Sequence, residues 1–146
     1  IRPPLVYGKG VEGNFGRLLS LIRKGIPLPV AAINNKRSLV FLGNLCDLIR
    51  VCIDHPNASA GIHLISDGQD LSTPELIRKM AYYCGRQTRI FPVPVCLLKW
   101  LGKVAGYANE IQRLSGNLQV DGSMTKEWLQ WQPPFTFEQG LQRTIL

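Results

Sequence analysis

Short helix-forming stretches alternate with short extended stretches along the whole chain, and a glycine or a proline closes most of them. In the first helix-forming stretch the apolar residues stand at positions 15, 18, 19 and 22, which is the spacing of one helix face. Gly25 can adopt the left-handed conformation that ends a helix, and Pro27 prevents the helix from resuming. The pattern predicts a helix-rich α/β protein in which every strand is short.

Similar start and stop signals divide the rest of the chain. Polar N-caps are predicted at Asn14 and Asn44, and capping boxes at 72–75 and 136–139. The sequence contains no internal repeat, low-complexity segment or linker, so we expect one unit rather than two domains. We predict about six or seven helices, at 15–24, 45–54, 73–84, 94–104, 109–114, 123–129 and 137–145, and strands at 2–7, 28–33, 38–42, 62–65 and 88–91.

Composition and charge limit the classes of function. With 146 residues, 45% of them apolar, the chain can bury a core, and its apolar runs fall far short of the roughly 20 residues that span a bilayer. The net charge of +7 suits anionic partners such as nucleotides, sugar diphosphates or nucleic acid. Basic residues adjoin only in pairs, which argues against a nucleic-acid-binding surface.

The chain begins at Ile1, without a methionine, on a strand-like stretch, so we expect a fragment of a longer protein. Its cysteines form no Cys-x-x-Cys pair and have no histidine at metal-ligand spacing. We therefore expect buried, reduced thiols in a cytoplasmic protein, and no metal site. These cysteines are Cys46, Cys52, Cys84 and Cys96.

Several segments, in this order, resemble one family. They are Arg-Pro-Pro-Leu-Val-Tyr-Gly-Lys-Gly (2–10), Asn-Phe (14–15), Gly-Ile-Pro-Leu-Pro-Val (25–30), Lys-Arg-Ser-Leu-Val-Phe-Leu-Gly-Asn-Leu (36–45), Gly-Gln-Asp-Leu-Ser-Thr-Pro-Glu-Leu (68–76) and the Asp-Gly-Ser-Met-Thr-Lys to Glu-Gln-Gly-Leu region (121–141). Together they resemble the C-terminal, substrate-binding part of the NAD-dependent epimerases and dehydratases, the extended short-chain dehydrogenases. The resemblance is nearest to the UDP-glucose and UDP-N-acetylglucosamine 4-epimerases and related 4-reductases. It implies a helix-rich portion of a Rossmann-type α/β fold.

The resemblance also implies a diphosphate site. Arg37 and Arg113 stand at the family's diphosphate-binding positions, and a guanidinium matches phosphate oxygens with two hydrogen bonds. Asn14 and Phe15 stand where an asparagine side chain and a backbone amide meet the diphosphate at a helix start. Each arginine could instead be a solvated surface residue, and Asn14 could be only a helix cap.

Base and cofactor contacts are implied in the same way. Leu28, Pro29 and Val30 stand in the extended segment whose backbone groups pair with uracil in the family. Pro3 and Pro4 stand where the family packs against the nicotinamide of NAD, although prolines at a strand end also simply stiffen the chain. The resemblance therefore implies a UDP-sugar substrate and an NAD cofactor.

Two departures and two absences qualify this picture. Leu5 stands where the family often has a substrate-holding asparagine, and Ser38 replaces an aspartate, so the sugar is left open. No tyrosine is followed four residues later by lysine, so we expect no catalytic residue in this chain. The glycine spacing at 8–13 is not taken as a dinucleotide fingerprint, because its context does not fit. NAD would then be held mainly by an N-terminal Rossmann domain absent from this chain, and residues 1–146 would be the substrate-binding part.

The full-length protein is accordingly expected to be an NAD-dependent nucleotide-sugar 4-epimerase of polysaccharide synthesis. A 4-reductase or dehydratase on the same scaffold is one alternative, and a basic helical module that binds nucleic acid or protein is another. We expect a homodimer or self-association through the first strand, no nucleic-acid partner and no membrane partner. His55, His63 and the three tryptophans are interpreted as structural.

Overall fold

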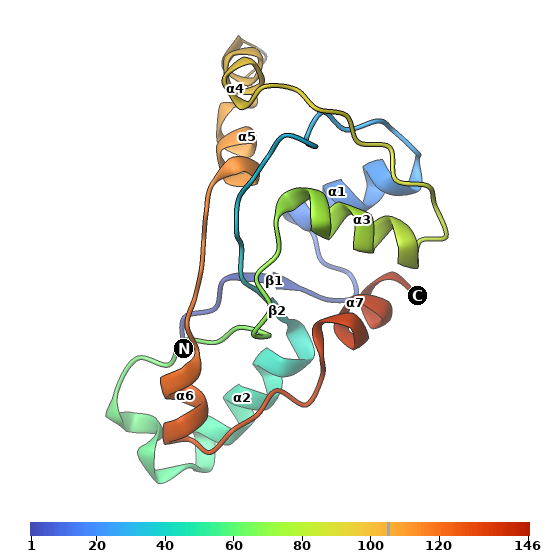
Figure 1. The fold of residues 1–146 in the computed structure, drawn as a ribbon. Coiled ribbons are helices and arrows are strands. Elements are labelled where there is room, and N and C mark those ends of the chain that lie inside the picture. The colour runs from blue at the N-terminus through green and yellow to red at the C-terminus, as the bar shows by residue number, and fades with distance from the viewer. Residues whose placement is uncertain (105) are drawn as a thin grey trace. The chain divides into compact units, whose positions relative to one another are not determined.

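The structure is a computed structural model that describes residues 1–104 and 106–146. The described part contains seven α-helices and two short strands, as the sequence predicts for a helix-rich α/β chain (Figure 1). In chain order the elements are β1 (Leu5–Tyr7), α1 (Gly13–Arg23), β2 (Leu39–Phe41), α2 (Leu42–Asp54), the 3-10 helix η1 (Pro56–Ala60), α3 (Thr73–Tyr83), α4 (Val95–Val104), α5 (Ala108–Ser115), α6 (Ser123–Trp128) and α7 (Phe137–Ile145).

The chain divides into two compact units rather than forming the single unit predicted from the sequence. Residues 1–10, 38–70 and 118–146 form one of them, which we call the sheet unit. Residues 11–37 and 71–117 form the other, which we call the helical unit. Because the chain passes from one unit to the other several times, no single change in composition along the sequence marks a boundary between the units.

The sheet unit is built on two parallel strands. β1 pairs with β2 in the register Leu5–Leu39, Val6–Val40 and Tyr7–Phe41, and α7 packs on both strands (Figure 1). Val40 lies in the core with buried apolar residues of α2, of the segment after η1 and of the segment after α6. The core residues packed with it are Leu48, Ile65, Leu129 and Trp131.

Asp67 is the polar centre of the sheet unit. It accepts a hydrogen bond from the Tyr7 hydroxyl at 2.7 Å, from the Phe41 backbone amide at 3.0 Å and from the Asn44 side chain at 2.8 Å. Burial and the charge of Asp67 raise the pKa of Tyr7 well above its usual value, so this tyrosine stays protonated. Tyr7 therefore joins the sheet to Asp67 and to the start of α7 by donating hydrogen bonds.

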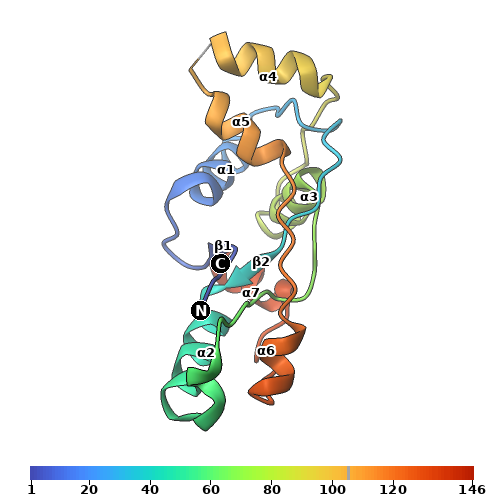
Figure 2. The ribbon, with the colours of Figure 1, turned by 90° about the vertical axis from the view of Figure 1, so that its left-hand side faces the viewer.

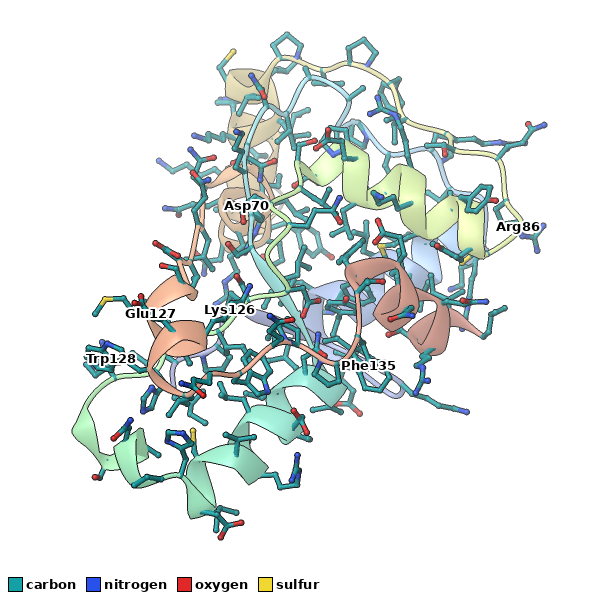
Figure 3. The ribbon with its side chains drawn as sticks, turned by 60° about the horizontal axis from the view of Figure 1, so that its bottom comes forward. Asp70, Arg86, Lys126, Glu127, Trp128 and Phe135 are labelled. Atoms are coloured by element: carbon teal, nitrogen blue, oxygen red, sulfur yellow. The ribbon has the colours of Figure 1, made fainter. Side chains whose placement is uncertain are left out.

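The prediction that Asn44 caps α2 is wrong. The helix begins at Leu42, and Asn44 lies in its first turn with no exposed surface. The side chain exchanges two hydrogen bonds with the backbone of Phe135, at 2.9 and 3.0 Å, in addition to its bond to Asp67. The ring of Phe135 packs edge-on against Phe41 beside this contact (Figure 3). A long-range partner therefore takes the side chain that a local cap would have used.

The helical unit is held by two helix pairs. α1 packs on α3, and α4 packs on α5 (Figure 2). α3 begins with the predicted capping box, in which Ser72 and Glu75 satisfy each other's backbone amides. The predicted strands at 28–33 and 88–91 are reduced to one bridge between Leu28 and Ile90. Likewise, 62–65 in the sheet unit contributes a bridge from Leu64 to Arg2 and no regular strand.

Several burial predictions are also corrected. All four cysteines are free, as predicted, but none is buried. Trp131 is buried and its indole donates to Asp47 at 2.8 Å, whereas Trp100 and Trp128 are exposed. His63 is buried in a structural position, with its Nε2 2.8 Å from the Ala58 carbonyl.

Candidate functional site

A buried asparagine organises the segment that carries Arg37. Asn35 is 2% exposed, and its amide donates to the Thr73 hydroxyl at 3.2 Å and to the carbonyls of Leu114 and Gly116 at 3.0 and 3.1 Å. Its carbonyl accepts from the Thr73 backbone amide at 2.9 Å. Asn35 thus ties its own segment to the start of α3 and to the end of α5.

Arg37 is held by its backbone, and its guanidinium has no partner among residues 1–104 and 106–146. Its amide and carbonyl bond to Leu71 at 2.9 and 3.0 Å, which fixes the start of the side chain. Within the described residues the buried Nε makes no hydrogen bond, and no carboxylate pairs with the guanidinium. Burial lowers the pKa of Arg37, which still leaves the group charged near neutral pH. A half-buried cation with an unused donor is suited to an anionic ligand.

Arg113 lies on the last turn of α5, one residue before Leu114, whose carbonyl accepts from Asn35. Its side chain is exposed and makes no hydrogen bond or ion pair within the described part of the chain. The structure therefore ties the segments of Arg37 and Arg113 into one hydrogen-bonded cluster. A cation at this position also interacts favourably with the carboxyl end of α5, which is a structural role that needs no ligand.

Asn14 does not cap α1, which corrects the prediction made from the sequence. The helix begins at Gly13, with Glu12 as N-cap residue and no side-chain bond to the cap. Asn14 lies half-buried in the first turn, and Phe15 beside it is 1% exposed in the core. No acidic side chain stands in this first turn, so the free backbone amides at the start of α1 favour an anion.

An ion pair connects α1 with α5 on the side of these residues. The guanidinium of Arg17 lies 3.8 Å from the carboxylate of Glu110, and the Arg17 side chain is largely exposed, so the pair contributes little stability. Residues three apart share a helix face, which places Asn14 on the face of Arg17 and Arg113 on the face of Glu110. The ion pair thus joins the helix faces that carry two of the predicted site residues.

The segment at 28–30 has fewer free backbone groups than the sequence suggested. The Leu28 amide donates to Arg89 at 2.8 Å, and its carbonyl accepts from Phe91 at 3.0 Å. The Val30 amide donates back to Leu28 at 3.0 Å. Pro29 has no amide hydrogen, and its carbonyl has no partner within the described residues. The Val30 carbonyl accepts from Ile33 at 3.0 Å, so a ligand at this segment would find the Pro29 carbonyl as its free acceptor and no free amide donor.

Pro3 and Pro4 precede β1, with Pro3 exposed and Pro4 half-buried. Their side chains offer flat apolar surface and no hydrogen-bond donor. They are therefore suited to packing against a flat ring such as nicotinamide, and they cannot bind a charged phosphate. Within the described residues no cluster of histidine, cysteine or carboxylate side chains could bind a metal ion. No helix in the same part of the chain is long and apolar enough to cross a membrane.

Asn35 and Thr73 are the residues of this cluster that sequence reasoning missed. Asn35 belongs to a polar run, Asn34 to Arg37, that is typical of an exposed turn. Thr73 was seen only as part of the α3 capping box, yet its hydroxyl donates to Leu114 at 2.6 Å. Nothing local distinguishes these side chains, because their partners lie 38 to 81 residues away.

Comparison with curated proteins finds two relatives, and both are 4-epimerases. No protein-family model matches the chain. A UDP-glucose 4-epimerase from Vibrio cholerae is 50% identical over 145 residues, which cover 99% of this chain and 44% of that protein. The N-acetyl-alpha-D-glucosaminyl-diphospho-ditrans,octacis-undecaprenol 4-epimerase of Escherichia coli O157:H7 is 25% identical over 157 residues, 99% of this chain and 47% of that protein. The chain thus spans less than half the length of these curated relatives.

A solved structure matches the fold over nearly the whole chain. The Bordetella bronchiseptica enzyme WbmG, in complex with NAD and UDP, superposes with a TM-score of 0.67 at 14% identity, covering 97% of this chain and 41% of that one. At this identity the likeness concerns the fold, which is the Rossmann-type fold of extended short-chain dehydrogenases. In sequence and in fold the chain is thus similar to the C-terminal part of NAD-dependent epimerases and dehydratases.

Proposed function

We propose that the chain holds the diphosphate of a UDP-sugar within a nucleotide-sugar 4-epimerase of polysaccharide synthesis. The 50% identity to a UDP-glucose 4-epimerase supports the reaction class, and both curated relatives are 4-epimerases. A 4-reductase or dehydratase has no comparable support. The basic helical module without enzymatic ancestry explains the charge but neither the fold nor the relatives.

The observation that carries this proposal is the unpartnered Nε of Arg37. A donor buried without an acceptor destabilises the unliganded protein, and a phosphate oxygen would satisfy it with a charge-assisted hydrogen bond. The free amides of α1 and the side chains of Asn14 and Arg113 supply further donors around the same anion. The base would lie by the segment at 28–30, where the Pro29 carbonyl accepts a hydrogen bond from the uracil edge.

NAD would be held mainly by residues outside this chain. Of the residues present, Pro3 and Pro4 fit one face of a flat ring and nothing more, so their role is packing. When bound, the cofactor supplies reversible hydride transfer at the sugar ring. The residues of this chain bind and orient the substrate, and the acid and base that move the hydroxyl proton lie elsewhere, because no Tyr-x-x-x-Lys pair occurs here. We further propose that the protein acts in the cytoplasm and associates through the edge of β1, which light scattering tests.

The test compares UDP with uridine on the gene product that contains this chain. Calorimetry should give UDP binding in the wild type and weaker UDP binding in Arg37→Ala and Arg113→Ala, with uridine affinity unchanged, since uridine has no phosphate. Arg86→Ala is the matched control, because Arg86 is an exposed arginine just after α3 in the same unit (Figure 3). Equal loss of UDP and uridine affinity, or no UDP binding by the wild type, would remove the diphosphate role.

A further inference from the structure

One face of α4 carries apolar side chains that lie in solvent. Leu97, Trp100, Leu101 and Val104 stand at the i, i+3, i+4, i+7 spacing and share one side of the helix. They are 45%, 61%, 47% and 71% exposed, respectively. We call these four residues the outer stripe. A helix of this pattern normally turns such a stripe toward a core, so the outer stripe lacks its usual partner.

The contact with α5 determines which side of α4 faces outward. Leu98 and Gly102 are the buried residues of α4, which lies against α5 (Figure 2). A Cβ on Gly102 would meet the end of the Ile111 side chain, so the glycine favours the close approach of the two helices. At 3.6 residues per turn, the outer stripe is centred roughly a third of a turn away from this contact. It cannot turn inward unless the two helices separate.

The charge around the outer stripe is positive. Lys99 and Lys103 lie one turn apart on α4 beside Trp100, and both are exposed. Neither forms an ion pair within the part of the chain that the structure describes. Residues 86–109 contain four lysines and arginines and no aspartate or glutamate. A surface of this kind complements an anionic partner with an apolar interior.

We propose that the outer stripe docks α4 on the surface of a lipid bilayer that carries anionic headgroups. A helix with leucine and tryptophan on one face and lysines beside them is suited to lie in the plane of the membrane interface. Trp100, and Tyr107 just after the helix at 60% exposure, have the amphipathic rings that favour this depth. The lack of a membrane-spanning helix in the described residues does not bear on this mode, because such a helix needs no bilayer-crossing length. This surface revises the expectation of no membrane partner and stands independently of the proposed diphosphate site.

Two other occupants fit less well. A single-stranded nucleic acid needs aromatic stacking platforms, whereas three of the four residues in the outer stripe are aliphatic. A second copy docked by two-fold symmetry would gather four lysines around one contact, and α4 has no acidic residue to pair with them. Of these three occupants, the membrane surface satisfies both the apolar stripe and the lysines.

The first experiment is vesicle flotation of the gene product that contains this chain. Binding is expected to phosphatidylcholine vesicles that contain phosphatidylglycerol, and only weakly to phosphatidylcholine alone. Salt raised to about 1 M, where the Debye length is about 3 Å, should weaken the binding. Brominated lipids should quench the fluorescence of the wild type more than that of Trp100→Phe. Absence of binding to the anionic vesicles at low salt would overturn the proposal.

Matched variants locate the surface. Lys99→Gln/Lys103→Gln should lower vesicle partitioning about 25-fold, because each lysine near the surface contributes roughly a fivefold increase. The control Lys9→Gln/Lys24→Gln should change partitioning much less. Leu101→Ser/Val104→Ser should abolish vesicle binding, because it removes apolar surface from the outer stripe, while the exposed pair Ile53→Ser/Tyr82→Ser should retain it. Equal losses of vesicle binding in the α4 variants and in their control variants would overturn the assignment of the outer stripe as the membrane-binding surface. So would α4 variants that dissociate a dimer and leave vesicle binding intact, because the outer stripe would then be a contact between copies.

Discussion

Replacing Arg37 by methionine should have opposite effects on stability and on ligand binding. Without ligand, the wild type keeps a half-buried guanidinium whose Nε has no acceptor within the described residues. An unsatisfied buried donor costs roughly 1–3 kcal/mol, and partial exposure of Arg37 places it at the lower end. Arg37→Met fills a similar volume without a donor, so the free energy of unfolding should rise by about 1 kcal/mol.

The same substitution should weaken UDP binding. Hydrogen bonds to charged groups contribute about 1.5–3 kcal/mol, which corresponds to about a 10- to 150-fold loss of affinity. Urea unfolding without ligand measures the first effect, and titration calorimetry with UDP measures the second. Arg37→Lys, which keeps the charge but loses the planar fork, should bind UDP with intermediate affinity. A variant that is destabilised without ligand and binds UDP like the wild type would refute the reasoning, because Arg37 would then serve the fold.

Three further predictions concern the framework of the two units. Asn35→Ala should lower the free energy of unfolding by about 2–3 kcal/mol, because it leaves a buried backbone amide of α3 unpaired. Urea unfolding measures this change. A free energy within about 0.5 kcal/mol of the wild type, the effect of an ordinary surface substitution, would contradict this role of Asn35. Gly140→Ala should lower the free energy of unfolding by about 1–3 kcal/mol in the same assay, since the new Cβ would lie 2.7 Å from the Tyr7 hydroxyl oxygen. An unchanged free energy of unfolding would show that the neighbouring side chains move to relieve this contact. The hydrogen bond from Trp131 lowers the pKa of Asp47, so its stabilisation is present above about pH 4 and is lost as the pH falls further. The difference in stability between wild type and Trp131→Phe should therefore shrink in acid, and a difference independent of pH would exclude Asp47 as its source.

Sequence reasoning located most helices because their signals are local. The capping boxes at Ser72 and Thr136 form as predicted, since each needs only residues within one turn. The stop at His55, before Pro56, also ends α2 as predicted. Asn44 failed as a predicted cap because Phe135, 91 residues away, is its partner. Local patterns predict where a helix runs, and long-range contacts decide what its polar side chains do.

The candidate site shows the same division. The arginines and Asn14 were identified by resemblance to a family, whereas the buried asparagine at position 35 that positions Arg37 carries no local signal. The helix at 94–104 was predicted, but the exposure of its outer stripe was not, because periodicity reports that apolar residues share a side and not what covers that side. Burial and hydrogen-bond partners come from tertiary packing, which one sequence without its fold does not determine.

The most direct test of the diphosphate site is a crystal structure of the gene product with UDP bound. The account predicts a phosphate oxygen about 2.7–3.2 Å from the Nε of Arg37, with Arg113 and the start of α1 around the same diphosphate. A diphosphate bound elsewhere, with the Arg37 Nε still lacking an acceptor, would contradict it.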